Sequence, residues 1–162
     1  MVRGSAPDRP AFLDSPLLPK IILAMSRAHV WLYRATSGRV GGRFRIGPAF
    51  PRGVPVCLLT TRGKKTGKLR TAPLLFLEEG ENVVLVGSQG GQPRDPLWYG
   101  NVLVDPRVTI QIRSRARPMR ARTATSEERA VLWPRLVALY PDFERYQSWT
   151  DRIIPVVVCE PE

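Results

Sequence analysis

Residues 54–77 read VPVCLLTTRGKKTGKLRTAPLLFL. Two apolar runs rich in Val, Leu, Thr and Phe flank RGKKTGKLR, which carries five positive charges in nine residues, with two glycines and no acid. Such runs on both sides of a glycine-containing polar segment are typical of two strands and their connection. The pattern predicts strands over Val54–Thr61 and Leu69–Leu77. The charges of the connection repel one another, so it has to meet either water or an anion.

The rest of the chain is predicted to form further strands and, in its second half, two helices. Four short runs, either apolar or alternating, have the composition of strands: Asn82–Gly87, Val108–Ser114, Pro118–Thr123 and Ile153–Cys159. A short helix is predicted within residues 94–106 and a longer one over residues 124–140, where Thr125 and Glu128 form a capping-box pattern. The sum favours a mainly β (α+β) fold, an antiparallel barrel or strongly curled sheet with helices packed outside.

The length of 162 residues suits one domain. Residues 1–14 are rich in proline and polar residues, which predicts a flexible N-terminal segment. Residues 15–38 predict an amphipathic helix, with Ser15 as its N-cap. Its basic residues recur every seven positions, and its apolar side comprises Leu17, Leu18, Ile21, Ile22, Met25, Ala28 and Leu32. Either this helix lies on the domain with a solvated basic stripe, or it contacts anionic lipid or covers the mouth of a site.

The net charge of +11 is concentrated in one part of the chain. Residues 1–70 hold 14 Lys and Arg against two acids, whereas residues 71–162 are nearly neutral. A localised positive field predicts a localised anionic partner: phosphates, a carboxylate tail or a membrane surface. The basic connection lacks the interleaved aromatic residues of a single-strand platform, so we predict no nucleic-acid partner.

The chain lacks the residues or motifs that several kinds of catalytic or cofactor site require. His29 is the only histidine and has no nearby cluster of cysteines or carboxylates, so neither a histidine-based triad nor a metal site is predicted. Cys57 and Cys159 lie in apolar runs without metal or redox spacing and are expected to be buried, reduced thiols. No G-x-G-x-x-G motif follows a strand, which argues against a Rossmann dinucleotide site.

A second loop, GSQGGQPRDPLWYGN at residues 87–101, follows the third predicted strand. Its glycines permit the left-handed backbone with which successive N–H groups face an anion. Trp98 and Tyr99 offer an aromatic face to a flat ring, and Asn101 offers an amide donor and acceptor. Together with the basic connection, this loop describes a site for a phosphorylated, planar cofactor. Two unconnected surface loops are the alternative that the pattern leaves open.

Three runs carry a resemblance to a known family: LLTTRGKKTGKLRTAPLLFL, VVLVGSQGGQPRDPLWYGNVLVDPRVTIQI and YPDFERYQSWTDRIIPVVVCEP. Over residues 11–161 the chain resembles the deazaflavin-dependent nitroreductases, which include quinone reductases of actinobacteria. The resemblance implies that residues 39–162 form a split β-barrel of the flavin- and deazaflavin-binding type. It also implies the reduced coenzyme F420, an 8-hydroxy-5-deazaflavin with a phospholactyl group and a polyglutamate tail. These are anions that RGKKTGKLR could meet.

The resemblance implies site residues by position. The expected coenzyme-binding residues are Lys64, Lys65, Thr66, Lys68, Arg70, Gly87, Ser88, Gln89, Leu97, Trp98, Tyr99 and Asn101. The hydroxyls expected to steady charge on the acceptor, and so to be catalytic, are those of Ser88, Tyr140 and Tyr146. Phe143 and Tyr146 are expected at the substrate side, although packing at helical spacing would equally place such aromatics together.

The activity that the resemblance implies is hydride transfer from the reduced coenzyme to a menaquinone-like quinone or a nitroaromatic acceptor. Gln89 stands where the nitroreductase that names the family has lysine, and Phe143 where it has tyrosine, which favours a quinone over bulky nitroimidazoles. A carrier that binds the deazaflavin without turnover is one alternative. A split-barrel reductase that binds FMN is another, although the polycationic connection suits a polyanionic tail better than one phosphate.

Cellular location is predicted from what the sequence lacks. The first residues lack the apolar core of a signal peptide, and no apolar run approaches transmembrane length. A cytoplasmic protein is expected, and the basic stripe of residues 15–38 also fits peripheral association with the inner face of the cell membrane.

Overall fold

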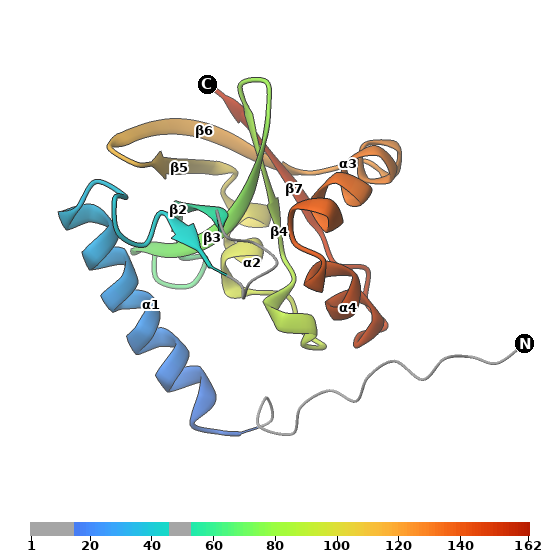
Figure 1. Ribbon diagram of the computed structural model, residues 1–162, viewed down its shortest axis with the longest axis horizontal. Helices are drawn as coiled ribbons and strands as arrows, with labels where there is room; N and C mark the ends of the chain where they lie inside the picture. The colour runs from blue at the N-terminus through green and yellow to red at the C-terminus, as the bar shows by residue number, and fades with distance from the viewer. Residues whose placement is uncertain (1–14, 46–52) are drawn as a thin grey trace, which may run out of the picture.

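The computed structural model describes residues 15–45 and 53–162, and in these residues seven antiparallel strands form one sheet. The order is β1-β2-β3-β4-β7-β6-β5, and β2 also pairs with β5. The strands are β1 (Arg43–Phe44), β2 (Val54–Arg62), β3 (Leu69–Glu79), β4 (Asn82–Val86), β5 (Arg107–Ile112), β6 (Arg115–Thr123) and β7 (Val156–Pro161). The helices are α1 (Leu18–Ala35), α2 (Leu97–Val104), α3 (Ser126–Leu139) and α4 (Asp142–Ser148). Figure 1 shows the curled sheet with α1 on one side and α3 and α4 on another.

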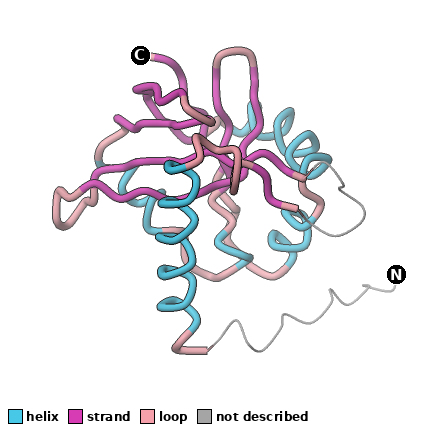
Figure 2. Tube along the Cα trace, turned by 60° about the vertical axis from the view of Figure 1, so that its left-hand side comes forward, coloured by secondary structure: helices cyan, strands magenta, loops and turns pink. Residues whose placement is uncertain are grey.

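The pairing of β2 with β5 closes the sheet into a barrel. Leu59 of β2 lies opposite Ile110 of β5 and also opposite Ala72 of β3, so β2 has a hydrogen-bonded neighbour on both edges. Figure 2 shows the strands wrapped around one another with the helices at the periphery. The predicted mainly β barrel with helices outside is therefore confirmed.

Alternation along the strands divides the core into two layers. Val83 and Leu85 of β4 point into the barrel interior, whereas Val84 and Val86 face α3 and α4. The same alternation holds in β7, where Cys159 is interior. Because successive side chains of a strand point to opposite faces, strands covered on both sides read as continuous apolar runs. Both cysteines are free and buried, as expected.

The β2–β3 connection is a tight turn. The N–H of Gly63 donates to the carbonyl of Lys68 at 2.8 Å, and the N–H of Gly67 donates back to the carbonyl of Gly63 at 2.7 Å. Gly67 has a φ of +67°, in the left-handed region where glycine costs least. The cationic side chains of the turn are exposed, and both flanking strands are confirmed.

Helix α3 begins with the predicted capping box. The hydroxyl of Thr125 accepts the N–H of Glu128, and the carboxylate of Glu128 accepts the N–H of Thr125. Arg122 of β6 also binds both oxygens of Glu128, at 2.7 and 2.8 Å, and reaches Glu160 of β7. These contacts fix α3 to the sheet. Helix α4, which follows α3 after two residues, was not predicted from the sequence.

Helix α1 differs from its prediction at the ends and in the side that packs. It spans Leu18–Ala35 rather than 15–38, and its N-cap is Leu17 rather than Ser15. Tyr33 is the side chain it buries, with a hydroxyl that donates to the carbonyl of Val56 at 3.0 Å. The predicted apolar side does not cover the barrel: Ile21 and Met25, for example, are 53% and 67% exposed. The predicted flexible segment 1–14 lies outside the described residues.

Candidate functional site

Asn101 fixes the basic connection to α2. Its side chain is buried, its carbonyl oxygen accepts the N–H of Lys64 at 3.0 Å, and its amide donates to the hydroxyl of Thr61 at 3.0 Å. Both polar ends of Asn101 are thus engaged within the protein. The structure therefore gives Asn101 a positioning role, and its direct contact with a coenzyme stays a prediction.

The cations of the connection stand in water around this anchor. Lys64 lies along α2, because a Cβ atom added to Gly100 would come within 2.9 Å of its Nζ atom. Lys65, Thr66, Lys68 and Arg70 are all exposed. Clustered, solvent-facing ammonium and guanidinium groups are the donors that bind phosphate and carboxylate well.

The loop after β4 forms the expected backbone nest. Ser88 has a right-handed backbone (φ −72°, ψ −38°), and Gln89 and Gly90 follow with φ of +45° and +61°. In the part of the chain that the structure describes, no acceptor bonds the N–H of Gln89 or Gly90. A Cβ added to Gly90 would meet nothing within 4 Å, so the space beside Gly90 is open. Successive N–H groups in this conformation bind an anionic or carbonyl oxygen.

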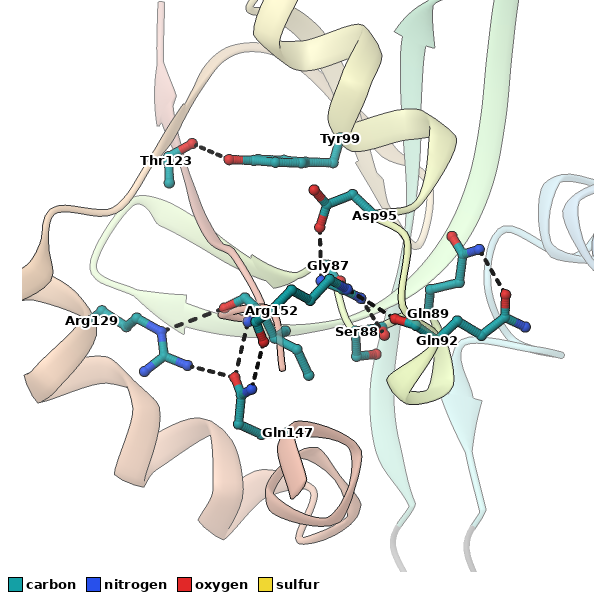
Figure 3. A network of polar contacts seen from close by, with 11 residues as sticks. Gly87, Ser88, Gln89, Gln92, Asp95, Tyr99, Thr123, Arg129, Gln147 and Arg152 are labelled. Carbon is teal, nitrogen blue, oxygen red and sulfur yellow. Dashed lines mark hydrogen bonds and ion pairs between the residues drawn. The ribbon is translucent and has the colours of Figure 1, made fainter. Parts of the chain in front are cut away.

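Arg152 holds this loop in place (Figure 3). Its guanidinium donates to the carbonyls of Gly87 at 3.1 Å, Ser88 at 2.9 Å and Gln92 at 2.9 Å. It also bonds the carboxylate of Asp95 at 2.7 Å, and its side chain is only 15% exposed. A planar fork of five N–H donors suits such a set of acceptors, which a lysine could not bond together.

A second set of hydrogen bonds holds the segment that carries Arg152. Gln147 of α4 donates to the carbonyl of Arg152 at 2.7 Å and accepts the N–H of Ile154 at 2.9 Å. Arg129 of α3 donates to the side-chain oxygen of Gln147 at 3.2 Å (Figure 3). The loop after β4 is therefore connected to both outer helices through side chains.

Two tyrosines lie together at this side of the barrel: Tyr140 at the C-terminal end of α3, and Tyr146 in α4 beside the same loop. The hydroxyls of Tyr140 and Tyr146 lie 3.1 Å apart, and either can donate to the other. A Cβ added to Gly91 would lie 2.8 Å from the backbone oxygen of Tyr146, so the loop and α4 are in close contact. Burial raises the pKa of Tyr140, and the hydrogen bond with Tyr146 raises it further, so Tyr140 keeps its proton near neutral pH.

The remaining predicted residues have mixed environments. Trp98 and Tyr99 are half-buried and pack on the barrel core, and the hydroxyl of Tyr99 bonds that of Thr123 at 2.8 Å. Leu97 is 84% exposed. Phe143 is buried and packs edge-on against Tyr140, with ring centroids 5.0 Å apart, so its contact with a substrate stays a prediction.

The structure thus joins the predicted segments at two places. Asn101 connects the basic connection to α2, and Gly91 packs the Ser88 loop against Tyr146. Arg152, which organises the loop, was not predicted from the sequence. The one available signal was its presence in the run YPDFERYQSWTDRIIPVVVCEP, and nothing in that run shows that its partners lie 57 to 65 residues away.

Comparison with known proteins identifies the family that this chain resembles. The family model described as F420H(2)-dependent quinone reductase matches residues 25–161. A putative F420H(2)-dependent quinone reductase of Mycobacterium tuberculosis is 48% identical over 117 residues, 72% of this chain and 98% of that protein. Another F420H(2)-dependent quinone reductase of M. tuberculosis is 36% identical over 135 residues, 82% of this chain and 87% of that protein.

Among solved structures, an F420-H2 dependent reductase has 42% sequence identity and a TM-score of 0.62, covering 65% of this chain and 94% of that one. The sequence matches and the barrel fold therefore indicate the same family. The chain belongs to the F420H(2)-dependent quinone reductase family.

Proposed function

We propose that this protein is an enzyme that transfers a hydride from the reduced coenzyme F420 to a quinone. The observation that carries the proposal is the set of long-range contacts that order the basic connection and the Ser88 loop. Asn101 fixes the basic connection beside α2, Arg152 holds the nest at Ser88 open, and Tyr146 packs against that nest. Family membership supports the coenzyme and the class of acceptor.

The residues of the site fit this coenzyme. The free N–H groups of Gln89 and Gly90 suit a ring carbonyl or a deprotonated ring oxygen. Lys64 and Lys65 suit the phosphate, because ammonium groups on a rigid turn make charge-assisted hydrogen bonds. Trp98 of α2 offers a half-buried aromatic surface.

When bound, the reduced deazaflavin supplies the hydride, and the quinone takes up that hydride and one proton to become the hydroquinone. The protein has to orient the acceptor and steady charge on its oxygen. Tyr140 is buried and protonated, and its hydrogen bond holds the hydroxyl of the more exposed Tyr146. Tyr146 is therefore the better candidate to touch the acceptor, with Tyr140 as its positioning residue. The catalytic roles of Ser88, Tyr140 and Tyr146 remain proposals.

The direct test is a titration under exclusion of air. The purified protein is mixed with reduced coenzyme F420, menadione is added, and absorbance of the oxidised deazaflavin band is followed. The proposal expects this band to grow only when enzyme, coenzyme and quinone are together. Binding without reoxidation of the coenzyme would favour the carrier. Binding of FMN in place of coenzyme F420 would favour the FMN reductase.

Replacing Tyr146 by phenylalanine should lower kcat for menadione about tenfold, the effect of losing one hydrogen bond of roughly 1.4 kcal/mol in the transition state. The dissociation constant of the coenzyme should not change, because Lys64 and the Ser88 loop remain. Stopped-flow reoxidation and fluorescence titration separate the two quantities. An unchanged kcat would remove Tyr146 from the reaction.

Nitroaromatic compounds are the second class of acceptor that we propose to test. Phe143 stands at the position where the resemblance to the nitroreductase would lead us to expect a tyrosine hydroxyl. It is 4% exposed and packs against Tyr140. It therefore offers neither a hydrogen bond nor a free surface to a nitro group. We expect quinones to be reduced faster than bulky nitroimidazoles in the same assay.

We further propose peripheral contact with anionic membranes through α1. No helix in residues 15–45 or 53–162 combines the length and hydropathy needed to cross a bilayer. Yet α1 exposes Ile21, Ile22, Leu23, Met25 and Trp31, by 51% to 71%, and carries only basic charged residues. Exposed apolar side chains among cations are typical of helices that lie in the lipid interface.

Flotation with vesicles of anionic lipid tests this contact. At low salt the protein should float with the vesicles, and Arg27→Glu should reduce the floated fraction severalfold because it places a negative charge on α1. Arg115→Glu makes the same charge change on β6 and should have little effect. Flotation that is absent at low salt, or lost equally in both variants, would contradict the proposal.

A further inference from the structure

Gln147 of α4 holds the segment between α4 and β7 at two points. Its Nε2 atom donates to the carbonyl of Arg152 at 2.7 Å, and its Oε1 atom accepts the N–H of Ile154 at 2.9 Å. Residues 152–155 belong to neither a helix nor a strand. The amide of Gln147, with one donor and one acceptor, therefore does for this stretch what a neighbouring strand would do.

Arg129 of α3 selects the orientation of this amide (Figure 3). Its guanidinium donates to Oε1 of Gln147 at 3.2 Å and to the carbonyl of Ile154 at 3.4 Å, and it lies over the ring of Trp133, 4.3 Å from the centroid. The opposite orientation of the amide would set its NH₂ group against two donors and its oxygen against a carbonyl. Gln147 is therefore held in one arrangement.

The stretch that Gln147 holds carries two contacts to the Ser88 loop. The carbonyl of Pro155 accepts the N–H of Gly87 at 2.9 Å. The guanidinium of Arg152 bonds the carbonyls of Gly87 and Ser88. Both contacts start from residues beside those that Gln147 bonds. The position of the loop therefore depends on where α4 holds this stretch.

Helix α4 also contacts the loop directly. A Cβ added to Gly91 would lie 2.8 Å from the backbone oxygen of Tyr146 and 3.2 Å from the Cβ of Trp149. Tyr146 is the residue before Gln147, so one turn of α4 acts on the loop both by contact and through Arg152. A shift of the stretch relative to α4 would change the spacing between the loop and the Tyr146 hydroxyl.

We propose that Gln147 is a positioning residue of the coenzyme site, which acts through Arg152 and not by contact with the coenzyme. The inference rests on the proposed function, in which the Ser88 loop binds the coenzyme and Tyr146 contacts the acceptor. Without the donor of Gln147, the stretch that carries Arg152 gains freedom, and so does the loop. Binding of the coenzyme then has to restore this order, which lowers affinity.

Gln147→Glu isolates the bond to Arg152. A carboxylate still accepts from Ile154 and Arg129, but it cannot donate and sets a negative oxygen against the carbonyl of Arg152. The dissociation constant of oxidised coenzyme F420, from fluorescence titration, should rise about tenfold. Gln147→Met, which loses donor and acceptor, should raise it at least as much. Ser148→Ala, the matched control on α4, removes an exposed hydroxyl bonded within its own helix and should leave it unchanged.

A double-mutant cycle separates positioning through Arg152 from a general loss of stability. Combined with Arg152→Ala, Gln147→Glu should weaken coenzyme binding by less than about twofold further, because the residue through which it acts is gone. Independent effects would multiply. Each protein is measured well below its melting temperature. If Gln147→Met does not fold, Gln147→Glu decides alone, since it keeps the bonds to α3 and to Ile154.

Hydrogen–deuterium exchange of the protein without coenzyme gives a second measurement. Gln147→Glu should speed exchange of the Gly87 N–H severalfold, because its acceptor, the carbonyl of Pro155, lies in the released stretch. Amides in the centre of β3 should exchange as in the wild type. Unchanged exchange at Gly87 would contradict the inference.

The remaining outcomes distinguish the inference from the proposed function. If the wild type binds the coenzyme and reduces menadione, wild-type affinity in both Gln147 variants would overturn the inference alone. Effects that multiply in the cycle would do the same. If the wild type does not bind the coenzyme, the proposed function fails, and the assignment of Gln147 to a coenzyme site fails with it.

Discussion

Replacing Arg152 by alanine is expected to raise the dissociation constant of coenzyme F420 about a hundredfold and to lower the melting temperature by roughly 4–8 °C. The change removes hydrogen bonds to the carbonyls of Gly87, Ser88 and Gln92 and an ion pair with Asp95. Freed from these bonds, the loop after β4 would lose the left-handed conformation at Gln89, which costs energy for a residue with a side chain. The loss of affinity reflects the energy needed to rebuild the nest.

Two variants separate positioning from charge. Arg152→Lys keeps the positive charge but cannot bond all the acceptors, so it should recover only a small part of the affinity. Arg145→Ala removes an arginine from α4 that is 53% exposed and should change affinity little. Isothermal titration and thermal unfolding of the three proteins give both quantities. A lysine variant with full affinity would mean that Arg152 acts through its charge alone.

The double change Lys64→Ala, Lys65→Ala is expected to reduce affinity for the coenzyme about a hundredfold and to flatten its dependence on salt. Both ammonium groups belong to the connection that we propose to meet the phosphate. The fold should persist, because the bond between Lys64 and Asn101 uses the backbone N–H, which alanine retains.

The matched control is Arg115→Ala, Arg117→Ala, which removes the same charge from β6 away from the loop. Affinity should be measured at several concentrations of NaCl for each protein. If the control pair weakens binding as much as the lysine pair, the coenzyme responds to the overall positive field. If neither pair matters, the basic connection serves another anion.

Much of the barrel could be predicted from local pattern. Val54–Thr61 and Leu69–Leu77 were recognisable as strands because β-branched and aromatic residues flank a turn with two glycines. The capping box at Thr125 was recognisable because its partners lie three residues apart. Helix α4 was not predicted, because seven residues are too few to show a clear helical period.

The side of α1 that packs on the barrel could not be predicted from its apolar pattern. Its apolar period predicts which side chains share a face, but the same period describes a helix on a core and one that faces outward. The structure buries Tyr33 and leaves Ile21 and Met25 exposed, because β2 and β3 offer acceptors and apolar contacts only near the C-terminal half of α1.

Local patterns in the sequence were enough to predict the strands, the two loops that could hold an anionic ring compound, and the resemblance to deazaflavin-dependent enzymes. These depend on neighbouring residues, whose spacing is visible in one dimension. The folded chain was needed to show that Asn101 anchors the connection, that Arg152 supports the Ser88 loop, and that Arg107 and Arg120 share a cavity with Lys64. Each of these contacts joins segments brought together by barrel closure, and that geometry follows from the packing of the whole chain.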